Sequence, residues 1–181
     1  FEQIKIDINL MNLPVKIFGV GASYSYDTAG PTHHSIDDIS LFRTLTNFKI
    51  FSPSDNASLE KLVKKDYNSK NPTYFRLDRK IVQNLDDKKL DLNKSFRLFS
   101  AKSKVCIIST GYCLNNIKKL WDENKNKKNK FDLIDFFELK NNKPSKLANI
   151  LKNYKLVFTI EEHTFNGGIG SIIAEIKTDF N

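Results

Sequence analysis

Short apolar runs that alternate with helical patterns constrain the fold of this chain more than any other feature. Six runs have the length and the β-branched or aromatic content of strands, at residues 15–20, 47–51, 72–77, 105–111, 131–137 and 156–160. Segments with helical spacing lie between most of them. Strands joined by crossover helices form a mainly parallel sheet with helices on both faces. The sequence therefore predicts an α/β protein.

A polar segment divides the predicted elements into two units. Residues 81–103 show no sustained period and contain the charge run Asp86-Asp87-Lys88-Lys89, so we interpret them as a linker that can include a short hairpin. Residues 1–80 then form the first unit, and residues 104–181 form a Rossmann-like second unit. The predicted fold is two three-layer αβα units with mainly parallel sheets.

Local patterns predict where elements of the first unit begin. Residues 1–13 fit a helix better than a strand, and the run 15–20 follows as a buried strand. Polar residues that are able to cap a helix predict one that starts near His33 or His34. The run 52–55 (SPSD) predicts the start of another helix.

The net charge of +8 does not by itself indicate a nucleic-acid partner. The lysines are interleaved with Asn and Asp, as in residues 122–130, without the Arg-aromatic interleaving of a base-stacking surface. We interpret them as a solvated surface and expect no nucleic-acid partner.

The remaining composition indicates an intracellular protein. No apolar run approaches the ~20 residues of a membrane helix, so we expect no membrane segment. The start of the chain, at Phe1, lacks an initiator Met and a signal-peptide pattern, as if it were cut from a longer protein. Cys106 and Cys113 lack the spacing of a zinc site, and we expect them to be reduced and packed. These features predict a cytoplasmic location and no metal ligands in this chain.

A loop rich in small residues follows the first predicted strand and is the expected place for chemistry. It contains Tyr24 and Tyr26, which are candidates for substrate contacts, although aromatic loop residues also pack against neighbours. It ends in residues 30–34 (GPTHH), where two adjacent histidines indicate a functional site. The alternative is a pair of histidines that solvate the start of a helix.

Three blocks of sequence, read in order, resemble the transketolase family. They are GPTHHSIDDISLFRTLTNFKIFSPSD at 30–55, YFRLDR at 74–79 and TIEEHTFNGGIGSIIAEI at 159–176. They look like the end of the pyrimidine-binding domain and the C-terminal domain of transketolases and 1-deoxyxylulose-5-phosphate synthases. The chain is most similar to the separate C-terminal subunits of split transketolases, and the resemblance covers nearly its whole length.

The resemblance implies roles for four residues. His33 matches the histidine that faces the substrate above the cofactor's thiazolium and hydrogen-bonds an oxygen as negative charge develops, which makes it the expected catalytic residue. His34 is its expected substrate-binding neighbour. Arg76 and Arg79 match arginines that bind a sugar phosphate or a carboxylate, and the alternative for both is a surface salt bridge.

The chain also departs from the family it resembles. The acidic residue that usually precedes Gly-Pro-Thr-His is Ala29 here, and a loop histidine that reaches the acceptor's phosphate aligns near Gly21. Both differences weaken the case for ordinary pentose-phosphate substrates.

Two motifs of the second unit have structural interpretations. The resemblance implies that Glu161-Glu162-His163 helps to build the C-terminal domain and its dimer contacts. The run Gly167-Gly168-Ile169-Gly170 lacks the full GxGxxG pattern and the later acidic residue of a dinucleotide site, so it predicts a tight helix-entry turn.

The resemblance implies the cofactors thiamine diphosphate and Mg²⁺. In the family, a preceding domain holds the diphosphate and the metal, and a Glu early in the pyrimidine-binding domain activates the cofactor; neither appears in this chain. The cofactor-binding residues are therefore expected mainly upstream of Phe1. We expect an incomplete catalyst that forms a homodimer or a heteromer with a cofactor-binding portion or subunit.

Three functions follow from the resemblance. The first is transfer of a two-carbon ketol unit between sugars or sugar phosphates. The second is a decarboxylating reaction on a 2-oxo acid, as in 1-deoxyxylulose-5-phosphate synthase or the β-subunit of a 2-oxo-acid dehydrogenase. The third is a non-catalytic assembly or regulatory subunit, which the residues Ala29 and Gly21 keep open.

Overall fold

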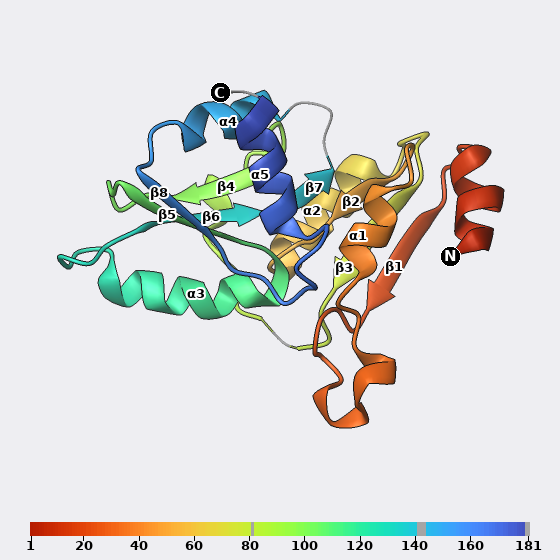
Figure 1. Ribbon diagram of the computed structural model, residues 1–181, viewed down its shortest axis with the longest axis horizontal. Coiled ribbons are helices and arrows are strands. Elements are labelled where there is room, and N and C mark those ends of the chain that lie inside the picture. The colour runs from red at the N-terminus through yellow and green to blue at the C-terminus, as the bar shows by residue number, and fades with distance from the viewer. Residues whose placement is uncertain (81, 141–143, 180–181) are drawn as a thin grey trace.

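The computed structural model describes residues 1–80, 82–140 and 144–179, whose strands form two four-stranded sheets (Figure 1). The first has the strand order β1-β3-β2-β7 and the second β4-β6-β5-β8. In each sheet three strands are parallel and one edge strand is antiparallel. The predicted α/β class with two mainly parallel sheets is confirmed.

The first sheet contains the three predicted strands of the first unit. They are β1 (Lys16–Val20), β2 (Lys49–Phe51) and β3 (Thr73–Leu77), and the π-helical segment η1 (Ile4–Leu10) precedes them. The prediction that β1 is buried is wrong, because β1 is an edge strand that, among the described strands, pairs with β3 alone. Its outer residues Phe18 and Val20 are 47% and 61% exposed.

The helix that was predicted to start near His33 or His34 begins later in the chain. Residues Pro31–His33 form only a short 3-10 turn, and helix α1 spans Asp38–Arg43. Ser23 and Ser35 explain the delay, because each backbone N–H donates to the other's carbonyl, at 2.9 and 3.0 Å. This pairing holds residue 35 in an extended bridge rather than in a helical turn.

Helix α2 (Asn56–Asp66) begins where its capping run predicts. The Asp55 carboxylate accepts a hydrogen bond from the Ser58 backbone N–H at 2.6 Å, and the Ser58 hydroxyl lies 3.3 Å from the Asp55 nitrogen. This reciprocal pair is a capping box, which satisfies backbone donors at the helix start. The helix buries Leu62 completely.

The second unit has three layers, in which helices cover both faces of the sheet that contains strand β5. Its strands are β4 (Phe96–Phe99), β5 (Val105–Ser109), β6 (Asp132–Phe136) and β8 (Leu156–Thr159), and its helices are α3 (Gly111–Asn124), α4 (Ser145–Leu151) and α5 (Ile169–Asp179). Figure 1 shows α3 on one face of the sheet and α4 with α5 on the other. Neighbouring residues of β6 face these two layers, since Leu133 packs in a cluster with α3 and Ile134 in a cluster with α5.

Two strands lie outside the units to which the sequence assigns them. The predicted linker, 81–103, contains the short helix η4 (Asp87–Lys89) and strand β4, which pairs with β6 in the second sheet. Strand β7 (Glu138–Lys140) follows β6 but pairs with β2 of the first sheet. The outer limits of the linker and the second unit, residues 81 and 181, lie outside the described residues.

The two units share one apolar core. A single cluster contains Phe42 and Ile50 of the first unit together with Ile108 and Ile172 of the second. None of the helices within residues 1–80, 82–140 and 144–179 is both long and apolar enough to cross a membrane.

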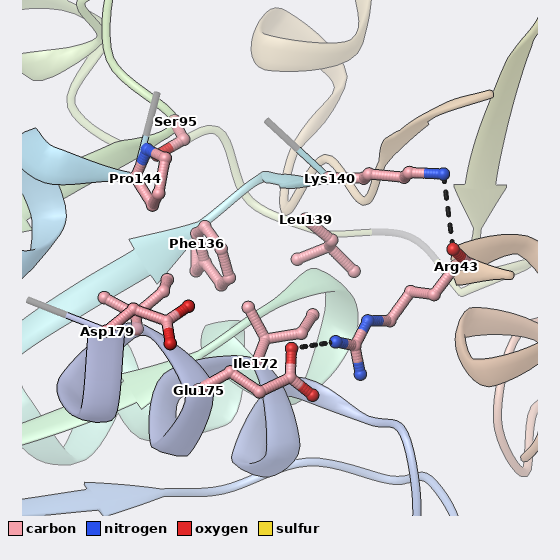
Figure 2. A pocket seen from close by; sticks show the side chains of 10 residues that line it. Arg43, Ser95, Phe136, Leu139, Lys140, Pro144, Ile172, Glu175 and Asp179 are labelled. Atoms are coloured by element: carbon pink, nitrogen blue, oxygen red, sulfur yellow. Dashed lines mark hydrogen bonds and ion pairs between the residues drawn. The ribbon is translucent and has the colours of Figure 1, made fainter. Parts of the chain in front are cut away.

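A cavity of about 230 Å³ lies between the units and shows how they are held together (Figure 2). The Arg43 guanidinium of α1 is bound by Glu175 of α5, and it donates to the Gly167 carbonyl at 3.1 Å. Lys140 of β7 donates to the carbonyls of Arg43 and Leu45 at the end of α1. Burial, followed by the charge of Arg43, lowers the pKa of Lys140. These cations therefore bind groups of the protein itself.

A buried arginine forms a second polar connection between the units. Arg97 of β4 is 1% exposed and donates to Asp135 of β6 at 2.7 and 3.1 Å and to Asp55 at 3.2 Å. Burial alone would lower the pKa of Arg97, but the two carboxylates outweigh it and raise that pKa. The carboxylate that caps α2 is thus fixed by a strand of the second unit.

We predict that Arg97→Met lowers the free energy of unfolding by about 3–5 kcal/mol, because two buried carboxylates lose their cation. Urea denaturation measures the change. The matched control Lys64→Met removes an ion pair with Glu60, in which the Lys64 side chain is 74% exposed and the Glu60 side chain 65%. This substitution should lower the free energy of unfolding by about 0.5 kcal/mol or less. Equal costs for the two variants would contradict this account.

Candidate functional site

The candidate site lies at the carboxyl ends of β1 and β3. Parallel sheets often bind ligands at this edge, where strands lead into loops. The Leu77 carbonyl at the end of β3 accepts hydrogen bonds from the backbone of Gly21 and Ala22, at 2.9 and 3.0 Å. The loop of residues 22–35 begins there and projects beyond the sheet, in the direction of the β1 arrow in Figure 1.

Three of the predicted site residues form one cluster on this loop. The Tyr26 ring lies 6.2 Å from the His33 ring, measured between centroids. The Arg79 guanidinium carbon lies 4.7 Å from the Tyr26 centroid, which is cation–π geometry. His33 and Arg79 are both exposed. An imidazole and a guanidinium are therefore presented together beside one aromatic ring.

Gly21 is the position that makes room for this cluster. A Cβ at residue 21 would lie 2.3 Å from the Tyr26 ring, and the Gly21 φ of +101° is one that other residues rarely adopt. In the sequence comparison, a loop histidine of the transketolase family aligns near Gly21. In this chain the Tyr26 ring fills the space that a side chain at residue 21 would need.

The second pair of predicted residues, Tyr24 and His34, lies on the same loop. Their rings meet edge to face with centroids 4.9 Å apart, and Tyr24 is 43% exposed. The His34 Nε2 atom is buried and has no hydrogen-bond partner among the described residues. Tyr24 therefore partly covers a histidine that keeps an unused polar atom.

Arg76 lies inside the protein rather than at its surface. It is 5% exposed, and its Nε donates to the two Asp38 carboxylate oxygens at 2.8 and 3.1 Å. Tyr74 also donates to Asp38, at 2.8 Å. Burial, followed by the Asp38 charge, raises the pKa of Tyr74, so its hydroxyl stays protonated. The salt bridge considered for Arg76 exists, but it is buried.

Sequence reasoning did not identify Asp38 as the partner of Arg76. A signal was present, because an arginine in the middle of an apolar strand requires a buried counter-charge. Local patterns did not indicate which acidic residue supplies it, since Asp38 and Arg76 are far apart along the chain.

The second unit also contacts the site. The His163 side chain is fully buried, with its Nε2 4.0 Å from an Asp38 oxygen. The Thr164 backbone N–H donates to the Ile36 carbonyl at 2.7 Å. Glu162-His163-Thr164 therefore closes the buried side of the site.

The predicted helix-entry turn in the second unit is confirmed. Glu161 accepts hydrogen bonds from the backbone N–H groups of Ile169 and Gly170, at 2.7 and 2.8 Å, so its carboxylate occupies the positive end of α5. Gly167 has a φ of +82°, and a Cβ there would lie 2.4 Å from the Ser40 Cβ of α1. The glycines let α5 approach both Glu161 and α1.

Phe1 lies outside the site cluster. The cofactor-binding residues are expected upstream of it. Phe1 is 47% exposed, and its backbone carbonyl accepts a hydrogen bond from the Lys5 N–H at 3.0 Å. Figure 1 shows this end of the chain beside η1 and well away from the loop 22–35. Phe1 therefore lies just before η1 and is joined to it by this hydrogen bond. The expectation about upstream residues stays a prediction.

The described residues do not provide a metal site. Within 1–80, 82–140 and 144–179, no group of three or more His, Cys, Asp or Glu side chains is placed to hold a metal ion. Cys106 and Cys113 are both free, and burial raises the pKa of the Cys106 thiol to about 12. This part of the chain therefore does not fit the Mg²⁺ that the resemblance implies.

Comparison with known proteins assigns both units to one class of protein. Residues 1–84 match the pyrimidine-binding domain of transketolase, and residues 96–181 match the transketolase C-terminal domain. Fold and matches together place the chain in the class of proteins that contain these two domains. The chain belongs to the transketolase family, as the resemblance predicts.

Relatives of two kinds are similar to nearly the whole chain. One subunit of the apulose-4-phosphate transketolase from Actinobacillus succinogenes is 29% identical, with 97% of this chain and 57% of that protein covered. 1-Deoxy-D-xylulose-5-phosphate synthase from Malacoplasma penetrans is 30% identical, with 90% and 26% covered. A solved split gene transketolase, described as an inactive β4 tetramer, has a TM-score of 0.82 and 27% identity, with 99% and 58% covered. The chain thus spans little more than half the length of the separate-subunit relatives.

We predict that Gly168→Ala and Glu161→Ala are not additive. Gly168→Ala should cost about 1–3 kcal/mol, because its Cβ would lie 2.3 Å from a Glu161 oxygen. Glu161→Ala should cost about as much, because two backbone donors lose their acceptor. In the double variant the steric clash disappears, so its cost should fall at least about 1 kcal/mol below the sum.

Urea denaturation of the four proteins measures this coupling. Gly170→Ala is the matched control, because its Cβ would meet the same carboxylate only at 3.4 Å and should couple weakly. Additive costs for Gly168 and Glu161 would show that the carboxylate does not occupy this position.

Proposed function

We propose that the chain is part of a thiamine-diphosphate-dependent transketolase-like transferase that moves a two-carbon ketol unit between sugar or sugar phosphate substrates. The observation that carries this proposal is that the exposed His33 and Arg79 lie together at the half-buried Tyr26, at the sheet edge of a transketolase-family chain. The relatives named as subunits of apulose-4-phosphate transketolases support a phosphorylated sugar as the substrate class.

His33 acts as the hydrogen-bond donor to the substrate. When bound, the cofactor supplies the nucleophilic carbon that attacks the substrate carbonyl. The Thr32 hydroxyl lies 3.0 Å from His33 Nδ1, and when it donates there, the neutral ring carries its proton on Nε2. An Nε2 proton can be donated to a carbonyl oxygen that is becoming negative, which stabilises the transition state.

Arg79 binds the anionic end of the substrate. Its planar guanidinium matches the geometry of a phosphate or carboxylate. The Tyr26 ring lies near both Arg79 and His33, so it orients both groups while its ring stays in contact with the cation. Tyr24 and His34 extend the same surface and contact the rest of the substrate.

The cofactor's diphosphate and its Mg²⁺ are held by a portion upstream of Phe1 or by another subunit. Two observations support this part of the proposal. The described residues lack a metal-binding cluster, and the similar proteins include single subunits of transketolases. The assembly is a heteromer in which this chain supplies substrate contacts. The two free cysteines fit the reducing environment of the cytoplasm, where we place the protein.

Two alternatives have specific support. The similar 1-deoxy-D-xylulose-5-phosphate synthases favour a decarboxylating reaction on a 2-oxo acid, and the similar split gene transketolase, described as inactive, favours an assembly role. Mixing the chain with a protein that carries the diphosphate-binding domain, thiamine diphosphate and Mg²⁺ separates them. Ketose cleavage supports the transferase, pyruvate decarboxylation supports the synthase, and a stable complex silent in both assays supports assembly.

We predict that His33→Ala lowers kcat of the reconstituted enzyme by about 10²–10³, because a hydrogen bond made in the transition state is lost. The free energy of unfolding should change by no more than about 0.5 kcal/mol, because His33 is exposed. Steady-state kinetics and urea denaturation measure the two effects. Unchanged turnover would exclude the catalytic role.

We predict that Arg79→Met raises KM for a phosphorylated substrate by about 10–100-fold, because a charge-assisted contact is lost. Lys80→Met is the matched control, since Lys80 is the next residue but lies over the Tyr112 ring, with its Nζ 4.6 Å from the centroid. The control should leave KM nearly unchanged. Equal effects would indicate a diffuse electrostatic contribution instead of a binding residue.

A further inference from the structure

We propose that Arg76 is a positioning residue that fixes the loop 22–35 by connecting Asp38 to the hydroxyl of Ser23. The inference rests on the proposed function, because this loop carries His33 and Tyr26. It assigns Arg76 a task other than direct contact with the substrate, and it leaves the binding of an anion to Arg79.

The two arms of the Arg76 guanidinium make different contacts. Nε donates to Asp38 at the start of α1, at 2.8 and 3.1 Å. Nη2 donates to the Ser23 hydroxyl at 2.9 Å and lies 3.4 Å from the carbonyls of Ser35 and Glu162. One rigid group therefore contacts the helix start, both ends of the loop and the second unit.

Ser23 is the point at which this contact controls the loop. Its φ is +61°, a backbone conformation that is uncommon for a residue with a Cβ and that persists where the surroundings hold it. Its backbone N–H and carbonyl pair with Ser35 at 2.9 and 3.0 Å. Tyr26 and His33 lie between these two serines, so a shift of Ser23 moves both of them.

Stability alone does not account for this arrangement. A buried ion pair often contributes little net stability, because desolvation of two charges offsets their attraction. Asp38 already receives hydrogen bonds from both Tyr74 and the Nε of Arg76. The additional bond to Ser23 adds geometric control of the loop, which a simple neutralising cation would not supply.

The variant Ser23→Ala tests the proposal, because it removes the bond to the loop and retains the Asp38–Arg76 pair. Ser40→Ala is the matched control, since the Ser40 hydroxyl donates locally to the Asp37 carbonyl, at 2.6 Å, and alanine keeps the Cβ that lies against Gly167. Arg76→Lys is the third variant. An ammonium retains the charge beside Asp38 but lacks the fork that reaches Ser23.

The first readout is the rate at which diethyl pyrocarbonate modifies each histidine of the isolated chain, mapped by mass spectrometry. The chain has three histidines, of which His33 is exposed, His34 is half-buried and His163 is buried. We expect His34 to react at least about tenfold faster in Ser23→Ala and in Arg76→Lys, because loss of a charged hydrogen bond shifts local opening by one or two orders of magnitude. The labelling rate of His34 in Ser40→Ala should equal that in the protein without substitutions.

The second readout is the steady-state kinetics of the reconstituted enzyme. Ser23→Ala and Arg76→Lys should lower kcat about tenfold or more while KM changes little, because His33 is displaced from the reacting oxygen. Unchanged labelling and kcat in Ser23→Ala would overturn the proposal, and so would full activity of Arg76→Lys, which would show that charge alone suffices. If the reconstituted protein is inactive, the proposed function fails, and the labelling rates alone decide whether Arg76 fixes the loop.

Discussion

The buried carboxylate of Asp38 is the constraint on which the site depends. A charge in the protein interior must be paired and hydrogen-bonded, and Arg76 and Tyr74 of the central strand β3 meet this requirement. Since Arg76 also donates to Ser23, the need to pair Asp38 fixes where the loop 22–35 leaves the sheet. His163 places the second unit against the same carboxylate. Helix α1, the sheet, the loop and the C-terminal unit therefore meet at one group.

Elements that depend on local sequence could be predicted, whereas those that depend on distant partners could not. The strands β3 and β5 and the Asp55 cap of α2 follow from apolar runs and from a capping residue four positions before the leucine at 59. The predicted start of α1 was wrong, because the backbone pairing of Ser23 with Ser35 competes with helical hydrogen bonds. The pairing of β7 with β2 and of β4 with β6 joins segments that local periodicity cannot relate.

The same distinction applies to the candidate site. The loop residues Tyr26 and His33 could be named from sequence, and the structure brings them together with Arg79. Arg76 lies within β3, whereas Arg79 lies beyond its end, so a buried counter-charge could be expected for Arg76. Its partner could not be named, because Asp38 lies 38 residues earlier in the chain. The contact between Gly21 and Tyr26 could be found only from the structure. It gives a steric reason why the chain lacks a larger residue at position 21.

Strand β7 gives the molecule a mechanical property that neither sheet has alone. After completing β6 in the second sheet, the chain enters the first sheet and closes the open edge of β2, with Phe51 opposite Glu138. The outer edge of β2 is therefore covered by a segment that follows strand β6 of the second sheet in the sequence. Only Phe137 separates β6 from β7, so the backbone joins the two sheets directly, and we expect them to unfold as one cooperative unit.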